Sequence, residues 1–391
     1  MAVPKLRFKE FEGDWNLSSL ANISSIITGN TPSTSNREYY DGEFLFVSPV
    51  DIQENRYIEK TKTTLTANGF SKCRHIPENS VLFVCIGSTI GKVAQNKVIC
   101  ATNQQINAVI PKKGYSSDFL YLQLERLAPN IKLNAGVQAV PLINKTEFGK
   151  TLLNTPTFIE QTKIAYFLSS VDEKITQLTQ KHQLLSQYKQ GMMQKLFSQQ
   201  IRFKADDGSE FEEWEEKQLG DVCHFINGRA YKQTEWEKEG TPVIRLQNLT
   251  GSGKEYYYST LNLPDHQYCY NNDLLYMWSA TFGPIFWQGE KAIFHYHIWK
   301  VEVKPQQLDK QYMYYLLDEM TEKMKSSLNG STMLHVTKQG MESTKKNLPS
   351  IEEQTKIANF LSAIDQKINV VSGQIEQAKL WKKGLLQQMF V

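Results

Sequence analysis

Cysteine is scarce in this sequence, with five residues among 391, at positions 73, 85, 100, 223 and 269, and no C-x-x-C pair. An odd, scattered set argues against a disulfide framework and a structural zinc site, and it favours a reducing compartment. Long apolar runs are missing as well, since the longest covers only Val81 to Ile86, so we expect no membrane span. The first ten residues lack the apolar core of a signal peptide. These absences together predict a cytoplasmic protein.

A strong excess of either charge is also missing. Lysine and arginine number 44 against 41 acidic residues, which gives a net charge of +3. A dedicated non-specific nucleic-acid binder is usually far more basic. Any contact with DNA must therefore come from local patches or be shared with partners. The length leaves room for two or three domains.

Catalytic motifs are absent too. We find no D/N-P-P-Y/F motif of an amino-methyltransferase and no G-x-S-x-G, and the G-S-G-K at Gly251 is too short for a phosphate loop. A nuclease site could be assembled only from Pro264, Asp265, Glu302 and Lys304, across a long gap and with ordinary strand alternation at its end. The chain therefore has the features of a binding protein more than those of an enzyme.

Four side chains of the second half could be considered as metal ligands: His266, Cys269, His295 and His297. The simpler interpretation is that two histidines share one face of a strand over Ala292 to Val301. Ligand identity without geometry and a closed shell does not make a metal site. We predict no metal and no cofactor bound by this chain.

A stretch of about 42 residues occurs twice. Pro156 to Phe197 aligns without a gap with Pro349 to Phe390, at an offset of 193 and with 17 identical positions. A period this long does not indicate a solenoid, whose repeats run roughly 20–50 residues. It indicates a duplicated half-molecule.

Each copy of this stretch predicts a long helix. A proline suits the helix start, and the apolar residues then recur in alternating steps of four and three, the heptad spacing of a coiled coil. This predicted seam comprises Ile164, Leu168, Val171, Ile175, Leu178, Leu185 and Met192 in the first copy and Ile357, Leu361, Ile364, Ile368, Val371, Ile375, Ala378 and Leu385 in the second.

The two helices could each pack on their own globular region, or they could pack on each other. We favour mutual packing as an antiparallel pair, because a helix of about 38 residues is about 57 Å long and the pair would form a stiff rod. His182 stands on the seam where the second copy has Ile375. We interpret it as a packed or register-setting side chain.

The duplication extends outside the helices, since R-F-K recurs at Arg7 and at Arg202, each followed by a tryptophan. The predicted order is globular region 1–155, helix 156–199, globular region 200–348 and helix 349–391. We therefore predict an α+β fold, in which two mixed α/β regions are joined by two long antiparallel coiled-coil helices with a pseudo-two-fold internal repeat.

Each globular region is expected to contain short strands followed by a helix. The interiors of the two regions do not match closely in sequence, which suggests two related sites that recognise different targets. The expected strands are 44–50, 80–86, 106–110, 242–246, 273–278 and 292–301, and the expected helices are 117–127 and 310–328.

Polar loops supply groups that suit base edges and phosphates. Arginine pairs with guanine, asparagine and glutamine with adenine, and lysine, serine and threonine with phosphate. Any one of these residues could instead be an ordinary solvated loop residue. The candidate DNA-binding residues are Asn30, Thr31, Ser33, Arg37, Ser88, Thr89, Lys92, Asn103, Gln104 and Gln105 in the first region and Arg229, Tyr231, Lys232, Arg245, Gln247, Asn248, Ser279 and Thr281 in the second.

Aromatic residues of the second region could stack on bases, although most of them are expected in the core. These are Tyr256 to Tyr258, Tyr276, Trp278, Phe282, Phe286 and Trp287.

The sequence resembles the DNA-specificity subunits of type I restriction–modification enzymes over nearly its whole length. The matching segments are I-E-E-Q-T-K-I-A-N-F-L at Ile351, its copy at Phe158, G-N-T-P-S at Gly29, G-S-T-I-G-K at Gly87 and N-D-L-L-Y-M-W-S-A-T-F-G-P at Asn272. The second region departs from this pattern, because Gly228 to Tyr231 lacks the G-x-T-P of the first.

The resemblance implies two target recognition domains that each read one half of a bipartite site in double-stranded DNA, with the helices as a ruler. It also implies a non-catalytic role beside two methyltransferase subunits and, optionally, two restriction–translocase subunits. S-adenosylmethionine, ATP and magnesium would belong to those partners.

Two other classes remain open on the sequence alone. A nuclease or methyltransferase with cryptic motifs would bind a cofactor as an isolated chain. A coiled-coil adaptor whose globular regions bind proteins would show little of the salt dependence that phosphate contacts produce.

Overall fold

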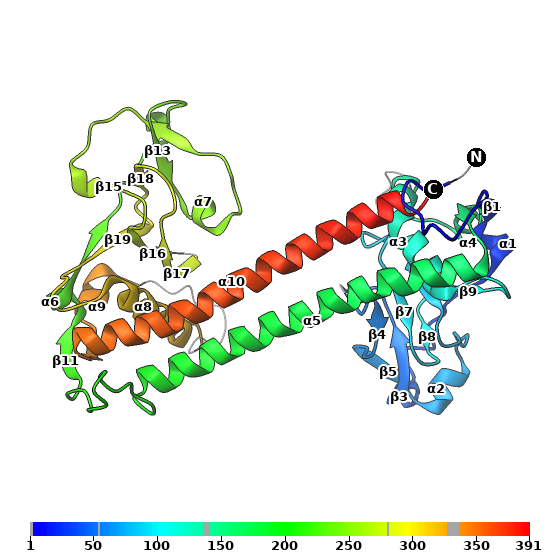
Figure 1. Ribbon diagram of the computed structural model, residues 1–391, viewed down its shortest axis with the longest axis horizontal. Coiled ribbons are helices and arrows are strands. Elements are labelled where there is room, and N and C mark those ends of the chain that lie inside the picture. Colours follow the sequence, from blue (N-terminus) through cyan, green and yellow to red (C-terminus); the bar gives the residue numbers. More distant parts are fainter. Residues whose placement is uncertain (1–2, 54, 136–140, 280, 327–335) are drawn as a thin grey trace. The chain divides into compact units, whose positions relative to one another are not determined.

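The computed structural model describes residues 3–53, 55–135, 141–279, 281–326 and 336–391. The chain divides into two compact units, Met1–Thr179 with Gly373–Val391 and Gln180–Ser372, and each contains a globular region with parts of both long helices (Figure 1). Within the described ranges, every helix is too short or too polar to span a membrane.

The first unit contains two main sheets, which are antiparallel except for the β4–β7 and β3–β8 pairs. The five-stranded sheet has the order β2 (Ser24–Thr28), β9 (Ile106–Pro111), β6 (Val81–Val84), β7 (Val93–Asn96) and β4 (Tyr57–Ile58). The three-stranded sheet has the order β5 (Thr63–Leu65), β3 (Tyr40–Val47) and β8 (Ala101–Thr102). The V-L-F-V of β6 is wholly buried, as expected of a central strand rich in β-branched residues.

The remaining elements of the first globular region lie near its ends or against the sheets. A short ladder joins β1 (Asn16–Ser19) to β10 (Leu152–Thr155). The helices are α1 (Leu20–Ile23), the single turn η1 (Arg37–Tyr39), α2 (Ala67–Ser71), α3 (Ser117–Leu133) and α4 (Lys145–Gly149).

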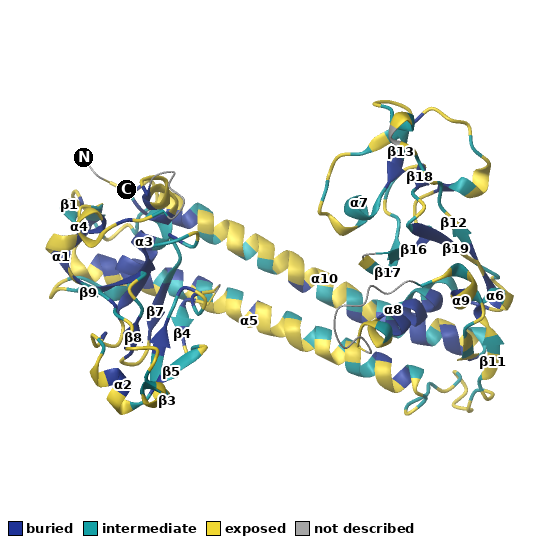
Figure 2. Cartoon of the chain, turned by 180° about the vertical axis from the view of Figure 1, so that it is seen from behind, coloured by how far each residue is buried: buried dark blue, intermediate teal, exposed yellow. Residues whose placement is uncertain are grey.

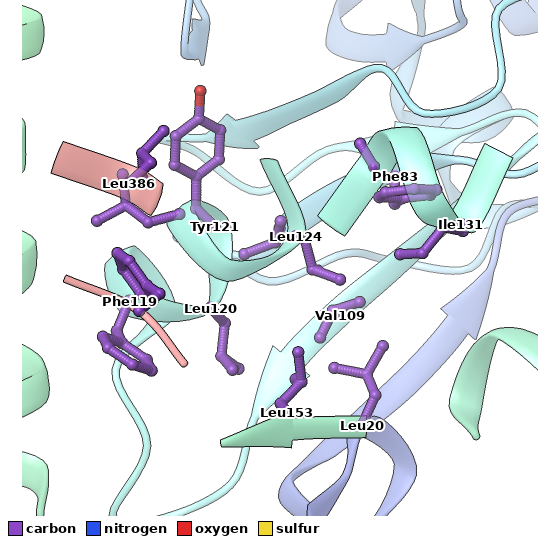
Figure 3. Packing of buried hydrophobic residues seen from close by; sticks show 14 of the residues in the cluster. Leu20, Phe83, Val109, Phe119, Leu120, Tyr121, Leu124, Ile131, Leu153 and Leu386 are labelled. Carbon is purple, nitrogen blue, oxygen red and sulfur yellow. The ribbon is translucent and has the colours of Figure 1, made fainter. Parts of the chain in front are cut away.

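The core of the first unit is built from distant parts of the sequence. Figure 3 shows Phe119, Leu120 and Leu124 of α3 together with Val109 of β9 and Leu386 near the end of the last long helix. The same cluster includes Trp15, whose ring lies 6.1 Å from that of Phe390. The globular region is therefore closed by residues that the chain supplies last.

The second unit repeats this plan with different sheets. One sheet has the order β12 (Cys223–Asn227), β19 (Ile298–Val303), β16 (Leu274–Ser279) and β17 (Thr281–Phe286), and the other has the order β14 (Tyr257–Ser259), β13 (Thr241–Ile244), β18 (Ala292–Phe294) and β15 (Tyr268–Cys269). A ladder joins β11 (Glu215–Gln218) to β20 (Lys345–Leu348). The helices and helical turns are α6 (Leu219–Val222), η2 (Gln233–Glu235), α7 (Leu246–Thr250), η3 (Asp265–Gln267), α8 (Lys310–Ser326) and α9 (Lys338–Glu342).

The long helices are α5 (Phe158–Phe197) and α10 (Ile351–Gln388). In the first unit they run antiparallel, and the ring of Phe167 lies 6.2 Å from that of Trp381 (Figure 1). The predicted α+β fold with paired long helices is thereby confirmed. Every seam residue predicted above is buried or half-buried. The first seam residues of each helix, however, belong to the globular cores, with Ile164, Leu168 and Val171 in one and Ile357, Leu361 and Ile364 in the other.

Buried polar contacts anchor each globular region to the start of its helix, and they recur in the second copy at the offset of 193, or 195 for the arginine. Gln161 accepts a hydrogen bond from the Ser116 N–H at 2.9 Å, and Gln354 accepts one from the Asp309 N–H at 2.8 Å. Arg7 pairs with Glu160 at 2.7 Å in the same way that Arg202 pairs with Glu353 at 2.8 Å.

A lysine from the other long helix completes each anchor. In the first unit, Lys382 of α10 lies 2.8 Å from both Glu125 of α3 and Asp172 of α5. Burial lowers the pKa of Lys382, but the combined effect of the two carboxylates is larger and opposite. The pKa of Lys382 is therefore raised above its ordinary value.

In the second unit, Lys189 of α5 occupies the matching place. It lies 2.8 Å from Asp365 of α10 and 3.9 Å from Asp318 of α8. The offset of 193 relates all three residues to Lys382, Asp172 and Glu125, so the duplication reaches into the globular regions whose interiors look dissimilar in sequence.

One strand prediction was wrong. The run 292–301 is not continuous, because β18 ends at Phe294 and β19 begins at Ile298, with a turn between them. The apolar and aromatic residues on both sides concealed that turn, since neither glycine nor proline marks it. The helix predicted over 310–328 ends at Ser326, and the remainder lies outside the described residues.

Replacing Lys382 with Ala should destabilise the first unit, because Glu125 and Asp172 would face each other without a cation. Loss of one partner from a partly buried network costs about 2 kcal/mol. Hydrogen exchange of the α3 amides measures the loss, and the exposed neighbour Lys383→Ala is the control. Equal exchange in the two variants would show that the lysine does not anchor α3.

Candidate nucleic-acid interface

Nine of the ten candidate residues of the first region lie on three loops, and the tenth, Arg37, begins the helical turn η1. The Thr31 hydroxyl donates to Gln104 at 2.8 Å, and the Gln105 amide donates to the Ile86 carbonyl at 3.3 Å. Glycine at position 29 allows this loop to lie close to residues 102 and 103, because a Cβ there would lie 2.1 Å from the Thr102 hydroxyl. Residues 29–33, 86–92 and 103–105 therefore form one polar surface.

Several of these candidates hold the loops in place. Asn30 donates to the Lys72 carbonyl at 2.9 Å and accepts from the Arg74 N–H at 2.7 Å. Asn103 donates to Gln105 at 3.0 Å, and the Lys92 ammonium donates to the Ile52 carbonyl at 2.7 Å. Their polar groups are therefore engaged within the loops, whereas other candidates are accessible to solvent. The exposed candidates are Thr31, Ser33, Arg37, Ser88 and Gln104, and Thr89 is half-buried.

In the second region, Arg229, Tyr231 and Arg245 meet around an aromatic side chain, Trp236. Tyr231 stacks on Trp236 with ring centroids 4.9 Å apart, and the Arg229 guanidinium lies 4.3 Å from the Tyr231 ring centroid. The Arg245 guanidinium lies 4.2 Å from the Tyr257 ring centroid and 5.7 Å from that of Trp236. We call these five residues the stacked cluster.

The other candidates of the second region lie beside this cluster or farther along the sheet. Asn248 accepts from the Arg245 N–H at 2.9 Å and fixes the start of α7, while the Lys232 N–H donates to Glu235 at 2.8 Å. The Gln247 side chain packs on Gly253. Ser279 and Thr281 face each other across the β16–β17 hairpin. Figure 2 shows the exposed loops around α7 and β13 and the buried strands β16 and β19 below them.

Sequence reasoning missed Trp236 and His295 as members of this surface. Trp236 stands alone in a charged segment, so neither periodicity nor a neighbouring aromatic signalled it. Most of the other aromatic residues were expected in the core, but among them only Tyr276 is fully buried and Tyr257 is exposed. Trp278 is half-buried and donates its indole N–H to the Tyr296 carbonyl at 2.9 Å.

The two histidines in the turn after β18 make no metal centre. Their ring centroids are 5.5 Å apart, and no group of three metal-ligating side chains occurs in the part of the chain that the structure describes. Burial, followed by repulsion from His297 and Arg245, lowers the pKa of His295 to about 4, so its imidazole is neutral at pH 7. Cys269 donates to the Ala292 carbonyl instead, and His266 is exposed on η3.

The groups considered for catalysis are engaged elsewhere. Asp265 accepts from the Tyr270 hydroxyl at 2.7 Å, Glu302 pairs with Lys300 at 2.8 Å and Lys304 donates to the Asp221 carbonyl at 2.6 Å. Burial raises the pKa of the thiol to about 12 at Cys85, Cys100, Cys223 and Cys269, so these are not activated nucleophiles.

Two polar surfaces on duplicated regions, each region followed in the sequence by a long helix, are the features of a recognition protein of the DNA-specificity class. The family described as "Type I restriction modification DNA specificity domain" matches the chain twice, over residues 12–187 and 211–380. The chain belongs to this family of non-catalytic recognition subunits, as the sequence resemblance predicted.

Similar proteins cover almost the whole chain. The MjaVIII specificity subunit of Methanocaldococcus jannaschii is 24% identical over 97% of this chain and 94% of its own length. The putative MjaX specificity subunit of the same organism is 27% identical over 98% and 94%. A crystal structure of the S subunit of the type I system from M. genitalium has the same fold, with a TM-score of 0.59 and 16% identity over 100% of this chain and 99% of that one.

Replacing His295 with Asn should weaken the pH dependence of stability. The folded-state pKa of about 4 lies below the ordinary 6.5, so the stability due to the neutral ring is complete above pH 6.5 and is lost as the pH falls towards 4. After discounting for the partial exposure of the ring, the wild type should lose about 1 kcal/mol more than the variant between pH 7 and 4.5.

Urea denaturation followed by tryptophan fluorescence measures this difference, because five of the seven tryptophans lie in the second unit. The exposed His266→Asn variant should behave like the wild type. Identical losses in the wild type and the His295→Asn variant would contradict the assignment.

Proposed function

We propose that the chain is the subunit through which a type I restriction–modification complex recognises its DNA sequence, with one half of a bipartite site read by each globular region. The observation that carries the proposal is the duplication of the anchors around two dissimilar loop surfaces. Arg7–Glu160 and Arg202–Glu353 are equivalent, whereas the Thr31–Gln104 surface and the stacked cluster share no side-chain arrangement. Two globular regions that are attached to the long helices in the same way but carry different loops suit the recognition of two different DNA half-sites.

The long helices then set the distance between the two readers. Towards the middle of the helices, Ile175 and Leu178 on α5 and Ile368 and Val371 on α10 are buried or half-buried. An antiparallel pair of this kind resists bending and fixes the number of unspecified base pairs between the half-sites.

The exposed faces of the same helices suit partner subunits. Tyr166 is 79% exposed and Trp381 is 54% exposed, beside the paired seam. We assign these faces to two methyltransferase subunits, with restriction–translocase subunits joining where present. S-adenosylmethionine, ATP and magnesium would be held by those partners, and the complex would act in the cytoplasm.

Exchanging residues 1–155 for the matching segment of another specificity subunit should change one half-site only. The donor needs an acid at the position of Glu125 and any residue except proline at that of Ser116, whose backbone N–H bonds to Gln161, so that the anchors to α5 and α10 survive. Methylation mapping in cells that also contain the methyltransferase partner reads both half-sites. A change in both of them would refute the two-reader arrangement.

Inserting one heptad into both long helices should lengthen the unspecified spacer and leave the half-site bases unchanged. The matched positions are Thr179/Gln180 in α5 and Ser372/Gly373 in α10, where the two units divide. Seven residues add about 10 Å of helix, or about three base pairs of DNA.

The control is the same insertion in α5 alone, which would shift its seam against that of α10 and should abolish assembly. A spacer of unchanged length in the doubly inserted chain would refute the ruler.

A further inference from the structure

Unsatisfied polar atoms gather in one part of the second unit. Buried side-chain atoms without a hydrogen-bond partner include Arg229 Nη1, Tyr231 Oη, Arg245 Nε and His297 Nδ1. Three of them belong to the stacked cluster, and the fourth lies on the turn whose other histidine contacts Trp236 at 5.9 Å. Because buried polar groups are normally paired, this concentration singles out the stacked cluster and the histidine turn for closer inspection.

The backbone makes this surface rigid. The Arg229 N–H donates to the Phe294 carbonyl at 3.1 Å, the His295 N–H to the Ile244 carbonyl at 2.9 Å and the Tyr296 N–H to the Arg229 carbonyl at 3.1 Å. These bonds tie together the segments that bear the two arginines and the histidine turn. The capping bond from the Arg245 N–H to the Asn248 side chain fixes the segment that carries Arg245.

The two arginines of the stacked cluster differ in how they are paired. The Arg229 guanidinium forms an ion pair with Glu235 at 2.6 Å. Arg245 forms an ion pair with no carboxylate in the described ranges of the chain. Its guanidinium is held over Tyr257, which is itself 39% exposed, so the cluster opens to solvent beside the free cation.

We propose that Arg245 reads a guanine in the half-site recognised by the second globular region, with its guanidinium donating to O6 and N7 in the major groove. The inference rests on the proposed function. A planar guanidinium group that is stacked on aromatic rings is already oriented and loses little conformational entropy on binding. This suits a bidentate contact to a base edge. A phosphate contact needs only a positive charge and gains nothing from such rigid stacking.

Arg229 and Tyr231 act as positioning residues in this arrangement. Their ion pair and stack hold Trp236 in place, and Trp236 with Tyr257 forms the platform of Arg245. The neutral His295 beside Trp236 adds no second positive charge to the platform.

Methylation mapping tests the proposal with the full chain expressed beside its methyltransferase partner. The variants are Arg245→Ala and Arg245→Lys, and the control is Lys254→Gln, which removes one exposed positive charge near α7. We expect the discrimination for guanine at one position to fall about 10- to 100-fold in both Arg245 variants. The other half-site and the spacer should not change, and the control should keep the wild-type motif.

Arg245→Lys keeps the positive charge and much of the alkyl chain, so it distinguishes loss of the bidentate guanidinium group from loss of folding. A uniform fall in methylation with an unchanged motif would overturn the proposal in favour of a phosphate contact or a packing role. A wild-type motif without guanine in the second half-site would overturn it as well. Absence of any bipartite motif in the wild type would instead refute the proposed function, and the guanine contact with it.

Discussion

Each globular region of this protein depends on a lysine from the long helix that starts in the other half of the sequence. Lys382 joins α10 to Glu125 and Asp172, and Lys189 joins α5 to Asp318 and Asp365. Opposite charges at this depth require one another, because a lone buried charge is costly. The position of α3 or α8 is thereby coupled to both helices at once.

The same coupling separates the fixed parts of the molecule from the variable ones. Leu168 and Leu361 are fully buried in the cores that meet the helices, and the anchors lie beside them. The loops with Thr31 and Arg245 lie on other elements, where side chains can change without touching those cores. The anchors and the candidate loops can therefore be altered independently of one another.

The sequence predicted the helices well because their evidence is local. The steps of four and three from Ile164 to Leu185 require no knowledge of the tertiary fold. The anchors could not be predicted in this way, since Glu125 and Lys382 are brought together only by folding. The turn at His295 to His297 escaped for another reason: turns without glycine or proline leave little trace in sequence.

The sequence indicated which types of residue the candidate loops carry, but it did not indicate what each side chain does in the folded protein. Asn30, Asn103 and Asn248 proved to hold backbone groups, as short polar side chains in loops often do, whereas Arg245 Nε has no hydrogen-bond partner among the described residues. Nothing in the sequence distinguishes these cases, because the outcome depends on which carbonyls lie within reach.

The discontinuous first unit also sets an order for folding during synthesis. Residues 385–391 pack with Trp15 and Phe119, yet the ribosome makes them after the whole of 180–372. At about 5–20 residues per second, the first globular region waits tens of seconds with part of its core uncovered while the second unit is made. The region translated first therefore completes its fold last, and until then its apolar surface is a target for chaperones.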